Sequence, residues 1–586
     1  MIKKLKYIIP LAVIVMLSSC KKDYLNINTD PNNPPDAPVD VLLPTAQRTL
    51  GDALSMGGGD NGGFSQILEV WVHRITTREE ADQYGTKGNE FFLSLAWPKF
   101  YASSPPPGAS EPLYGIFQNL EEIIKKSTAD GNIYYRGIAR VLKAYGYSQL
   151  VDAFGDIPFS EANKLDDPNN PIAYPKFDDD AEIYPKLLDT LNAALADLAT
   201  APEDAGLVQP GVDDVIYNGD VELWSKAART IQLKLYTQMS KVQDVSAQVQ
   251  ALLAVPEGLI ASTDESFLLP YGELGSTDDR NPAYQEYFAT QRSNHISPWF
   301  YETLKGVNPL INEGNRDPRI PYYFYNQLGK TEDPENQTEY RDSAFASIYF
   351  GSVGPDRDRN NQNTLTTLGV YPVGGLYDDG SAGGPGIANG VEGEDATGAA
   401  PYRFITYADR LYLEAELIHE GLAIGVEREV LDHAIKESFA TVDMVVQMAS
   451  VPQNIPPLAP NGIPTEAVQT YIDGVLAEFD AGDATKKLQV IMTQKWIQSF
   501  GNAVDAYSDY RRTGFPIMWD PSNTAMAPDG FAQPPLDGDP FQPDQKQVPV
   551  LVTASYPAFL PWVDDELETN PNAPTQDDHT KPFWMP

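Results

Sequence analysis

Residues 219–239 read GDVELWSKAARTIQLKLYTQM, and this stretch decides the fold class. Its large apolar side chains recur every three or four residues, which is the spacing of one face of an α-helix. Asp220 precedes them at the position where a carboxylate caps a helix. The stretch therefore predicts an amphipathic helix whose apolar face must pack against a partner. The apolar stripe consists of Trp224, Ala228, Ile231, Leu235 and Met239.

The same periodicity occurs at four other places and predicts helices on both sides of the middle of the chain. The stripe residues are Ile138, Val141, Leu142 and Tyr145; Leu187, Leu188, Leu191, Leu195 and Leu198; Leu411, Ala415, Ile418 and Leu422; and Leu488, Ile491, Met492 and Trp496. Tryptophans on such faces are more often core than ligand platforms, so we expect Trp224 and Trp496 to be buried. No clean repeat of fixed period was found, so periodicity alone leaves a solenoid of helical hairpins open.

The middle of the chain, about residues 256–400, has a different composition. It is rich in Gly, Asn, Asp and Tyr, as in YPVGGLYDDGSAGGPGIANG, and its helical periodicity is weak. Long irregular segments inside a globular chain are usually functional or disordered, and the tyrosines favour function. We therefore expect an irregular insert between two helical parts, followed by C-terminal loops over 516–586.

Composition excludes several classes of function. The chain has 42 Lys and Arg against 82 Asp and Glu, a formal net charge of -40. Nucleic-acid binding and attachment to anionic lipid headgroups both need concentrated positive charge, so both are excluded. Aromatic residues make up 11% of the chain, too many for an acidic disordered protein.

The only cysteine of the 586 residues, Cys20, follows an N-terminal segment with three lysines and a short apolar run. The run, residues 7–17, is too short to span a bilayer and is typical of a signal peptide. The sequence LSSC that ends at Cys20 resembles the lipobox of bacterial lipoproteins, in which the cysteine is lipidated. We therefore predict a signal peptide over 1–19 and a lipid on Cys20; an ordinary secretory signal is the alternative. The next segment, 20–45, is rich in Pro, Asn and Asp and is predicted to be a tether.

Six segments, in family order, resemble the SusD/RagB family of nutrient-binding outer-membrane lipoproteins of Bacteroidetes, in the SusD-like branch of the second type. They are YLNINTDPNNP (24–34), LVDAFGDIPFSEA (150–162), DVIYNGDVELWSKAARTIQLKL (214–235), RDPRIPYYF (316–324), TYADRLYLEAEL (406–417) and QKWIQSFGNAVDAYSDYRRTGFP (494–516). The family's C-terminal Arg is missing here, although Tyr556 and Pro557 are present.

The resemblance implies a mainly α fold of tetratricopeptide-like helical hairpins with a loop-rich ligand-binding subdomain. The SusD-like domain would cover 46–586, with its scaffold over about 46–255 and 401–515. The resemblance also implies a surface protein that is not an enzyme, that needs no cofactor, and that passes a nutrient to a SusC-like TonB-dependent transporter. The nutrient is a glycan, with a peptide as the alternative.

A glycan site needs exposed aromatic rings that stack on sugar rings, and amide or carboxylate groups that bond hydroxyls. Loop residues of these types are the candidates: Trp71, Trp97, Tyr101, Asn281, Tyr284, Tyr287, Asn294, Trp299, Tyr349, Tyr371, Tyr377 and Asp378. Each of them is, taken alone, more often a packed residue than a ligand contact. Arg511 and Arg512 are instead expected to hold carboxylates or backbone carbonyls.

Three other patterns were weighed. A formal GxGxxG at Gly57, Gly59 and Gly62 has no preceding strand, which argues against a phosphate site. Asp356, Asp358 and Asn360 alternate as in a calcium loop, but the turn glycine and the closing glutamate are absent, so no metal site is expected. A glycoside hydrolase, which needs two carboxylates at a set separation, remains the rival class.

Overall fold

The computed structural model describes sixteen stretches of the chain, and all structural statements below concern them. They are residues 37–57, 63–77, 83–84, 90–101, 115–165, 169–201, 207–275, 278–289, 294–332, 338–357, 364–380, 396–450, 454–533, 547–551, 553–575 and 581–586. Cys20, most of the GxGxxG pattern, and Asp358 and Asn360 lie outside these stretches. No helix in the described part of the chain is long and apolar enough to cross a membrane.

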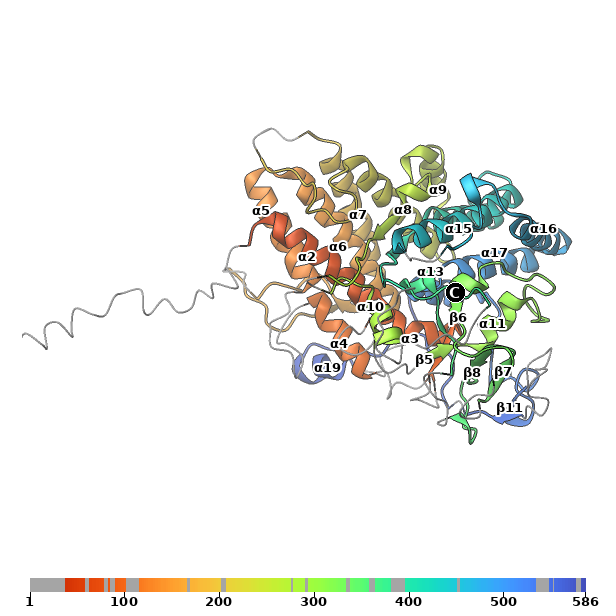
Figure 1. The fold of residues 1–586 in the computed structure, drawn as a ribbon. Coiled ribbons are helices and arrows are strands. Elements are labelled where there is room, and N and C mark those ends of the chain that lie inside the picture. The colour runs from red at the N-terminus through yellow and green to blue at the C-terminus, as the bar shows by residue number, and fades with distance from the viewer. Residues whose placement is uncertain are drawn as a thin grey trace, which may run out of the picture.

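The first half of the protein is a layer of antiparallel helices, at the left in Figure 1. In chain order they are α2 (Val39–Leu54), α3 (Phe64–Trp71), α4 (Glu90–Tyr101), α5 (Ile116–Asp130), α6 (Ile133–Phe154), α7 (Asp180–Leu198), α8 (Val221–Met239) and α9 (Ser246–Leu253). Neighbours in the chain pack as hairpins, α5 on α6, α6 on α7 and α7 on α8.

The helix predicted over 219–239 is α8, and Asp220 caps it as expected. The Asp220 carboxylate accepts the backbone N–H of Glu222 and Leu223 at 2.9 and 3.1 Å. All five stripe residues are buried, and the Trp224 indole N–H donates to Asp214 at 2.6 Å. The α6 stripe is also buried, whereas Leu188 and Leu195 of α7 are only half-buried.

The helices that follow the insert form a second layer, at the right in Figure 1. They are α14 (Tyr407–His419), α15 (Glu427–Ala449), α16 (Glu466–Ala481), α17 (Ala484–Gln498) and α18 (Ala503–Thr513). α14 pairs with α15, and α16 packs between α15 and α17. The mainly helical fold class built on helical hairpins is thereby confirmed.

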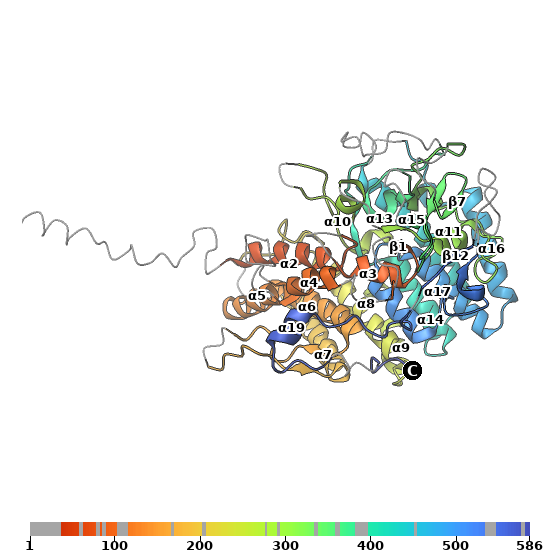
Figure 2. The same ribbon diagram turned by 90° about the horizontal axis from the view of Figure 1, so that it is seen from below.

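The middle of the chain supplies short helices and two-stranded sheets, which Figure 2 shows beside α15 and α17. The helices are α10 (Pro282–Tyr284), α11 (Pro298–Lys305), α12 (Ile320–Tyr323) and α13 (Val370–Val373). The strands are β4 (Phe267–Leu269), β5 (Asn294–Ile296), β6 (Phe324–Tyr325), β7 (Tyr340–Asp342), β8 (Phe345–Ser347), β9 (Thr367–Leu368) and β10 (Tyr402–Ile405).

Most of these strands pair with a distant part of the chain. β5 pairs with β1 (Ile75–Thr77), β4 with β10, and β6 with β9, while β7 and β8 form a hairpin. An early pair, β2 (Ile157–Pro158) with β3 (Phe177–Asp178), lies between α6 and α7. The pairings with β1 and β10 tie the insert to its flanks on both sides.

The C-terminal loops form a strap over the helices. The strap begins at β11 (Phe531–Ala532) and β12 (Val548–Pro549) beside β7, and passes through α19 (Asp564–Thr569) near α4, as Figure 1 shows. Arg511 holds it in place: its guanidinium donates to Ala558 O at 2.6 Å and lies 4.8 Å from the ring of buried Trp584.

The tether differs from its predicted boundary. α2 begins at Val39, and Leu43 is fully buried in the core. Residues 39–45 are therefore part of the helical scaffold, because the apolar residues Val39, Leu42 and Leu43 pack against the core and the helix continues through Pro44.

Candidate functional site

The structure places most of the candidate residues in the core. Eight of the twelve are buried: Trp71, Trp97, Asn281, Tyr284, Tyr287, Asn294, Tyr349 and Tyr371. The rings among these eight are therefore not exposed stacking surfaces, contrary to the expectation. Trp71 and Trp97 are buried in α3 and α4, and the insert folds back on the helices and covers its own tyrosines.

Hydrogen bonds satisfy the polar groups of several of these buried side chains. The Trp71 indole donates to Gln83 O at 3.0 Å, and the Tyr371 hydroxyl donates to Gln498 O at 2.8 Å. The Asn281 side chain is architectural too: it caps α10 through Ala283 N–H and donates to Ala400 O. Of these bonds, the one from Tyr371 joins the insert to the end of α17, whereas the others lie within the first helical part or within the insert.

Four candidates keep some exposure: Tyr101, Trp299, Tyr377 and Asp378. The Tyr101 hydroxyl donates to Pro158 O at 2.7 Å, which directs it inward. Trp299 lies against half-buried Trp519, with ring centroids 6.2 Å apart. The structure does not bring the twelve candidates together into one site.

A large cleft lies beside α16. Figure 1 shows this helix at its right-hand edge. Its volume is about 940 Å³, enough for an oligosaccharide or a short peptide. It is lined by parts of three stretches, 314–322, 456–458 and 465–471, and by Tyr377. Of the twelve candidates only Tyr377 lines it.

The segment RDPR, residues 316–319, forms one side of the cleft, with Arg316, Asp317 and Pro318 in its lining. Asp317 and Arg319 form a fully buried ion pair, with Nε donating to Oδ1 at 2.9 Å and an Nη to Oδ2 at 2.6 Å. Burial alone would lower the pKa of Arg319, but the charge of Asp317 raises it well above its usual value. A second Nη donates to Ser438 at 2.7 Å. This arrangement holds the 314–322 segment against α15 and α16.

The walls of the cleft are tyrosine and proline. The Tyr377 ring meets the Tyr322 ring edge to face, 5.1 Å between centroids, and the Tyr322 hydroxyl donates to Pro456 O across the cleft. Burial raises the pKa of Tyr377, so its hydroxyl is neutral at physiological pH. Exposed Pro456 and Pro457 face the 314–322 segment. Such flat apolar surfaces fit the C–H faces of sugar rings or the side chains of a peptide.

The rim of the cleft is polar. Arg316, Glu466 and Thr470 are all exposed and line the opening. Asp317, the other carboxylate of the cleft, accepts hydrogen bonds from Arg319 at both oxygens. The cleft therefore offers stacking surfaces and hydrogen-bonding groups, but no second free carboxylate for glycoside hydrolysis among its described residues.

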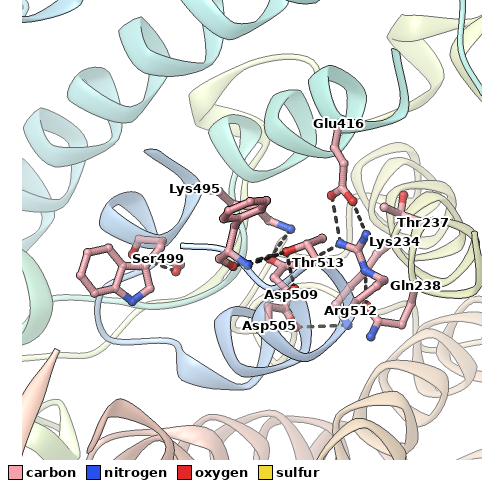
Figure 3. A network of polar contacts seen from close by, with 12 residues as sticks. Lys234, Thr237, Gln238, Glu416, Lys495, Ser499, Asp505, Asp509, Arg512 and Thr513 are labelled. Carbon is pink, nitrogen blue, oxygen red and sulfur yellow. Dashed lines mark hydrogen bonds and ion pairs between the residues drawn. The ribbon is translucent and has the colours of Figure 1, made fainter. Parts of the chain in front are cut away.

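A network of buried charged side chains lies between α8, α14, α17 and α18, outside the cleft. Figure 3 shows the Arg512 guanidinium directed at the Glu416 carboxylate, with Asp509 on its other side. Lys495 pairs with Asp509 at 2.7 Å, and Lys234 with Asp505 at 3.1 Å. These contacts confirm that Arg512 holds carboxylates.

The charges of the network compensate one another. Burial would raise the pKa of Asp509, but Lys495 and Arg512 hold it below its usual range. Burial would lower the pKa of Lys234, but Asp505 and Asp152 raise it. The space left among these groups is only about 10 Å³, which has no room for a ligand larger than water. The network is a structural element that joins α8, α14, α17 and α18.

Comparison with known proteins agrees with this architecture. Residues 108–534 match the SusD-like family described as "Starch-binding associating with outer membrane". The chain belongs to the SusD-like family. No curated protein sequence matches it.

Solved structures of SusD-like proteins share the fold. A Bacteroidetes SusD-like protein has a TM-score of 0.62 at 15% identity, over 94% of this chain and 100% of the other. A SusD/RagB family protein from Bacteroides thetaiotaomicron has a TM-score of 0.59 at 18% identity, over 94% and 99%. A chitin-binding protein has a TM-score of 0.58 at 19% identity, over 90% and 95%.

The residues of the cleft were missed as a site by sequence reasoning. The segment RDPRIPYYF was singled out as a family signature, yet none of its residues was a candidate. The other wall follows α15, where adjacent Pro456 and Pro457 precede α16. A run of two prolines before a helix is the one local signal of an exposed, rigid edge there.

Proposed function

We propose that this SusD-like protein is a cell-surface lipoprotein that binds a nutrient oligosaccharide in the cleft and delivers it to a SusC-like TonB-dependent transporter. The observation that carries the proposal is the 940 Å³ cleft with a half-buried tyrosine, proline walls and a polar rim. Membership of a family described as starch-binding supports a glycan as the ligand. A structural neighbour named as a chitin-binding protein supports the same class.

The lipid on Cys20 would anchor the protein to the outer membrane, with the body facing the exterior. An acylated N-terminus provides stable attachment without a membrane-spanning helix. In a Bacteroidetes host, we expect Cys20→Ala to leave the membrane fraction, while the wild type stays in it. A variant that remained membrane-bound and unmodified would contradict the lipid anchor.

The proposal is tested by calorimetric titration of the full-length protein, purified in detergent, against a panel of oligosaccharides and peptides, with chromatography of the products. We expect binding of an oligosaccharide without cleavage, and about tenfold weaker binding for Tyr377→Ala, because a stacking ring is lost. The matched control is Tyr174→Ala, since Tyr174 is 53% exposed and does not line the cleft.

Two results would replace this function by the alternatives. Binding of peptides alone would make the protein a peptide receptor of the same family. Release of shorter products would make it a glycoside hydrolase.

A further inference from the structure

Almost all arginines in the described stretches form hydrogen bonds or ion pairs within the protein. Arg319 binds Asp317, Arg512 binds Glu416 and Asp509, and Arg511 binds the strap. Arg316 differs: among the arginines in the described stretches it alone makes no hydrogen bond and no ion pair. It is exposed, and it lines the cleft.

An unpaired guanidinium is unexpected in a chain with 82 acidic and 42 basic residues, where carboxylates are plentiful. The backbone around Arg316 is fixed, because the next residue, Asp317, is buried in its ion pair with Arg319. The cation is therefore held at the rim of the cleft by a rigid segment. A guanidinium presents a planar fork of N–H donors that matches a carboxylate in two parallel hydrogen bonds.

The other charged group at the rim is Glu466, the first residue of α16, which likewise has no ion-pair partner among the described residues. Its position in the first turn is explained by the helix dipole, which favours a negative charge there. Its oxygens accept hydrogen bonds, as sugar hydroxyls require. Thr465 and Thr470 line the same side and add hydroxyl groups.

We propose that the cleft takes an oligosaccharide that carries a carboxylate, such as a uronic acid, and that Arg316 determines this specificity by binding the carboxylate. The inference rests on the proposed function and names the substrate class of the same site. Tyr377 and the prolines contact the apolar faces of the sugar, and Glu466 and Thr470 bind its hydroxyls.

The net negative charge of the protein does not prevent binding of such an acid. At physiological ionic strength the field of exposed charges is screened over about 8 Å, so distant carboxylates contribute little to the electrostatic potential at the cleft. A guanidinium in direct contact with the ligand is screened far less. Removal of this one cation should therefore leave a carboxylated ligand with no compensating charge at the rim.

The test compares one oligosaccharide in two forms. Oligomers of galacturonic, glucuronic and mannuronic acid, and the same oligomers with their carboxyl groups reduced to alcohols, are titrated into the full-length protein in detergent. We expect at least one acid to bind about tenfold or more tightly than its reduced form, because charge-assisted hydrogen bonds are the stronger ones. We expect Arg316→Gln to remove this preference and to bind the reduced form as the wild type does.

Arg428→Gln is the matched control, because it removes another exposed guanidinium that does not line the cleft. It should retain the preference for the acid. Circular dichroism of both variants confirms that they fold, as expected for exposed side chains.

The outcomes separate the two proposals. Binding of oligosaccharides with equal affinity for both forms, or an acid preference that survives Arg316→Gln, overturns the inference and leaves the proposed function standing. If no oligosaccharide binds, whether or not peptides do, the proposed function is overturned and the inference falls with it.

Discussion

Charged side chains are paired in the buried network around α18 but unpaired at the rim of the cleft. In the network, Arg512, Glu416 and Asp509 are buried and each is paired. At the rim, Arg316 and Glu466 are exposed and neither has a partner among the described residues. The difference indicates which charges stabilise the fold and which are available to bind a ligand. Substitutions in the two regions and in the strap test this distinction.

The largest effect is expected at Arg512. Arg512→Ala leaves the Glu416 carboxylate buried without its partner, which costs about 3–5 kcal/mol of unfolding free energy. Arg428 is the control, since its pair with Asp480 is about half exposed on both sides. Arg428→Ala should cost far less, because an ion pair exposed to water contributes little to stability. Urea unfolding measures both, and similar values for the two variants would contradict a structural role for the network.

The strap is tested at Gly155, which ends α6 with φ of 73°. A Cβ there would lie 2.6 Å from the ring of Phe559 in the strap. We expect Gly155→Ala to lower the unfolding free energy by about 3 kcal/mol, from backbone strain and overpacking together. Gly421 has φ of 74° but open space around it, so Gly421→Ala should cost only the backbone strain, about 1 kcal/mol. Equal losses of unfolding free energy in the two variants would show that the contact with Phe559 of the strap adds no cost.

A smaller effect depends on pH. The Asp180 carboxylate accepts the N–H of Phe583, near the end of the strap, at 2.9 Å. Burial, with Asp156 and Asp179 adding to it, raises the pKa of Asp180 to about 6 from an ordinary value of 3.8. The protonated Asp180 carboxyl is therefore favoured more in the folded state than in the unfolded state. Its contribution to the unfolding free energy is fully present below about pH 4 and is lost as the pH rises through 6.

Asp180→Asn should therefore match the wild type near pH 4 and exceed it by about 2 kcal/mol at pH 8. Thermal or urea unfolding at several pH values measures the difference between the two proteins. If the difference in unfolding free energy between Asp180→Asn and the wild type did not change with pH, ionisation of Asp180 would not destabilise the folded state.

The smallest effect on stability is expected at the rim. Arg316→Gln and Glu466→Gln should each change the unfolding free energy by less than about 0.5 kcal/mol, as is usual for unpaired surface groups. The same urea titration used for Arg512→Ala measures this. A loss of several kcal/mol for Arg316→Gln would place Arg316 with the structural charges and contradict the contrast between the two regions.

The helical scaffold was predictable because burial imposes the period of the helix on the sequence. Trp224 and Trp496 lie in the core as their stripes predicted. Arg511 was expected to bind carboxylates or backbone carbonyls, and it binds the carbonyl of Ala558 in the strap. Each of these predictions depended only on residues close together in the sequence.

The site was not predictable in the same way. A tyrosine in a Gly-rich segment has the same local pattern whether it is covered or exposed, and Tyr371 is covered whereas Tyr377 is half-buried. The cleft is formed by residues 314–322 and 456–471, which are distant in the sequence and meet only because Arg319 packs on α15 and α16. Local patterns carry no information about such a meeting.

Hydrogen exchange measured by mass spectrometry, with and without a saturating oligosaccharide found in the titrations, tests most directly that the cleft binds the nutrient. The account predicts that the ligand slows exchange in peptides covering residues 314–322 and 456–471. Protection confined to the peptides around Trp299 and Trp519, with the cleft unchanged, would contradict it and place the site on the other exposed aromatic surface.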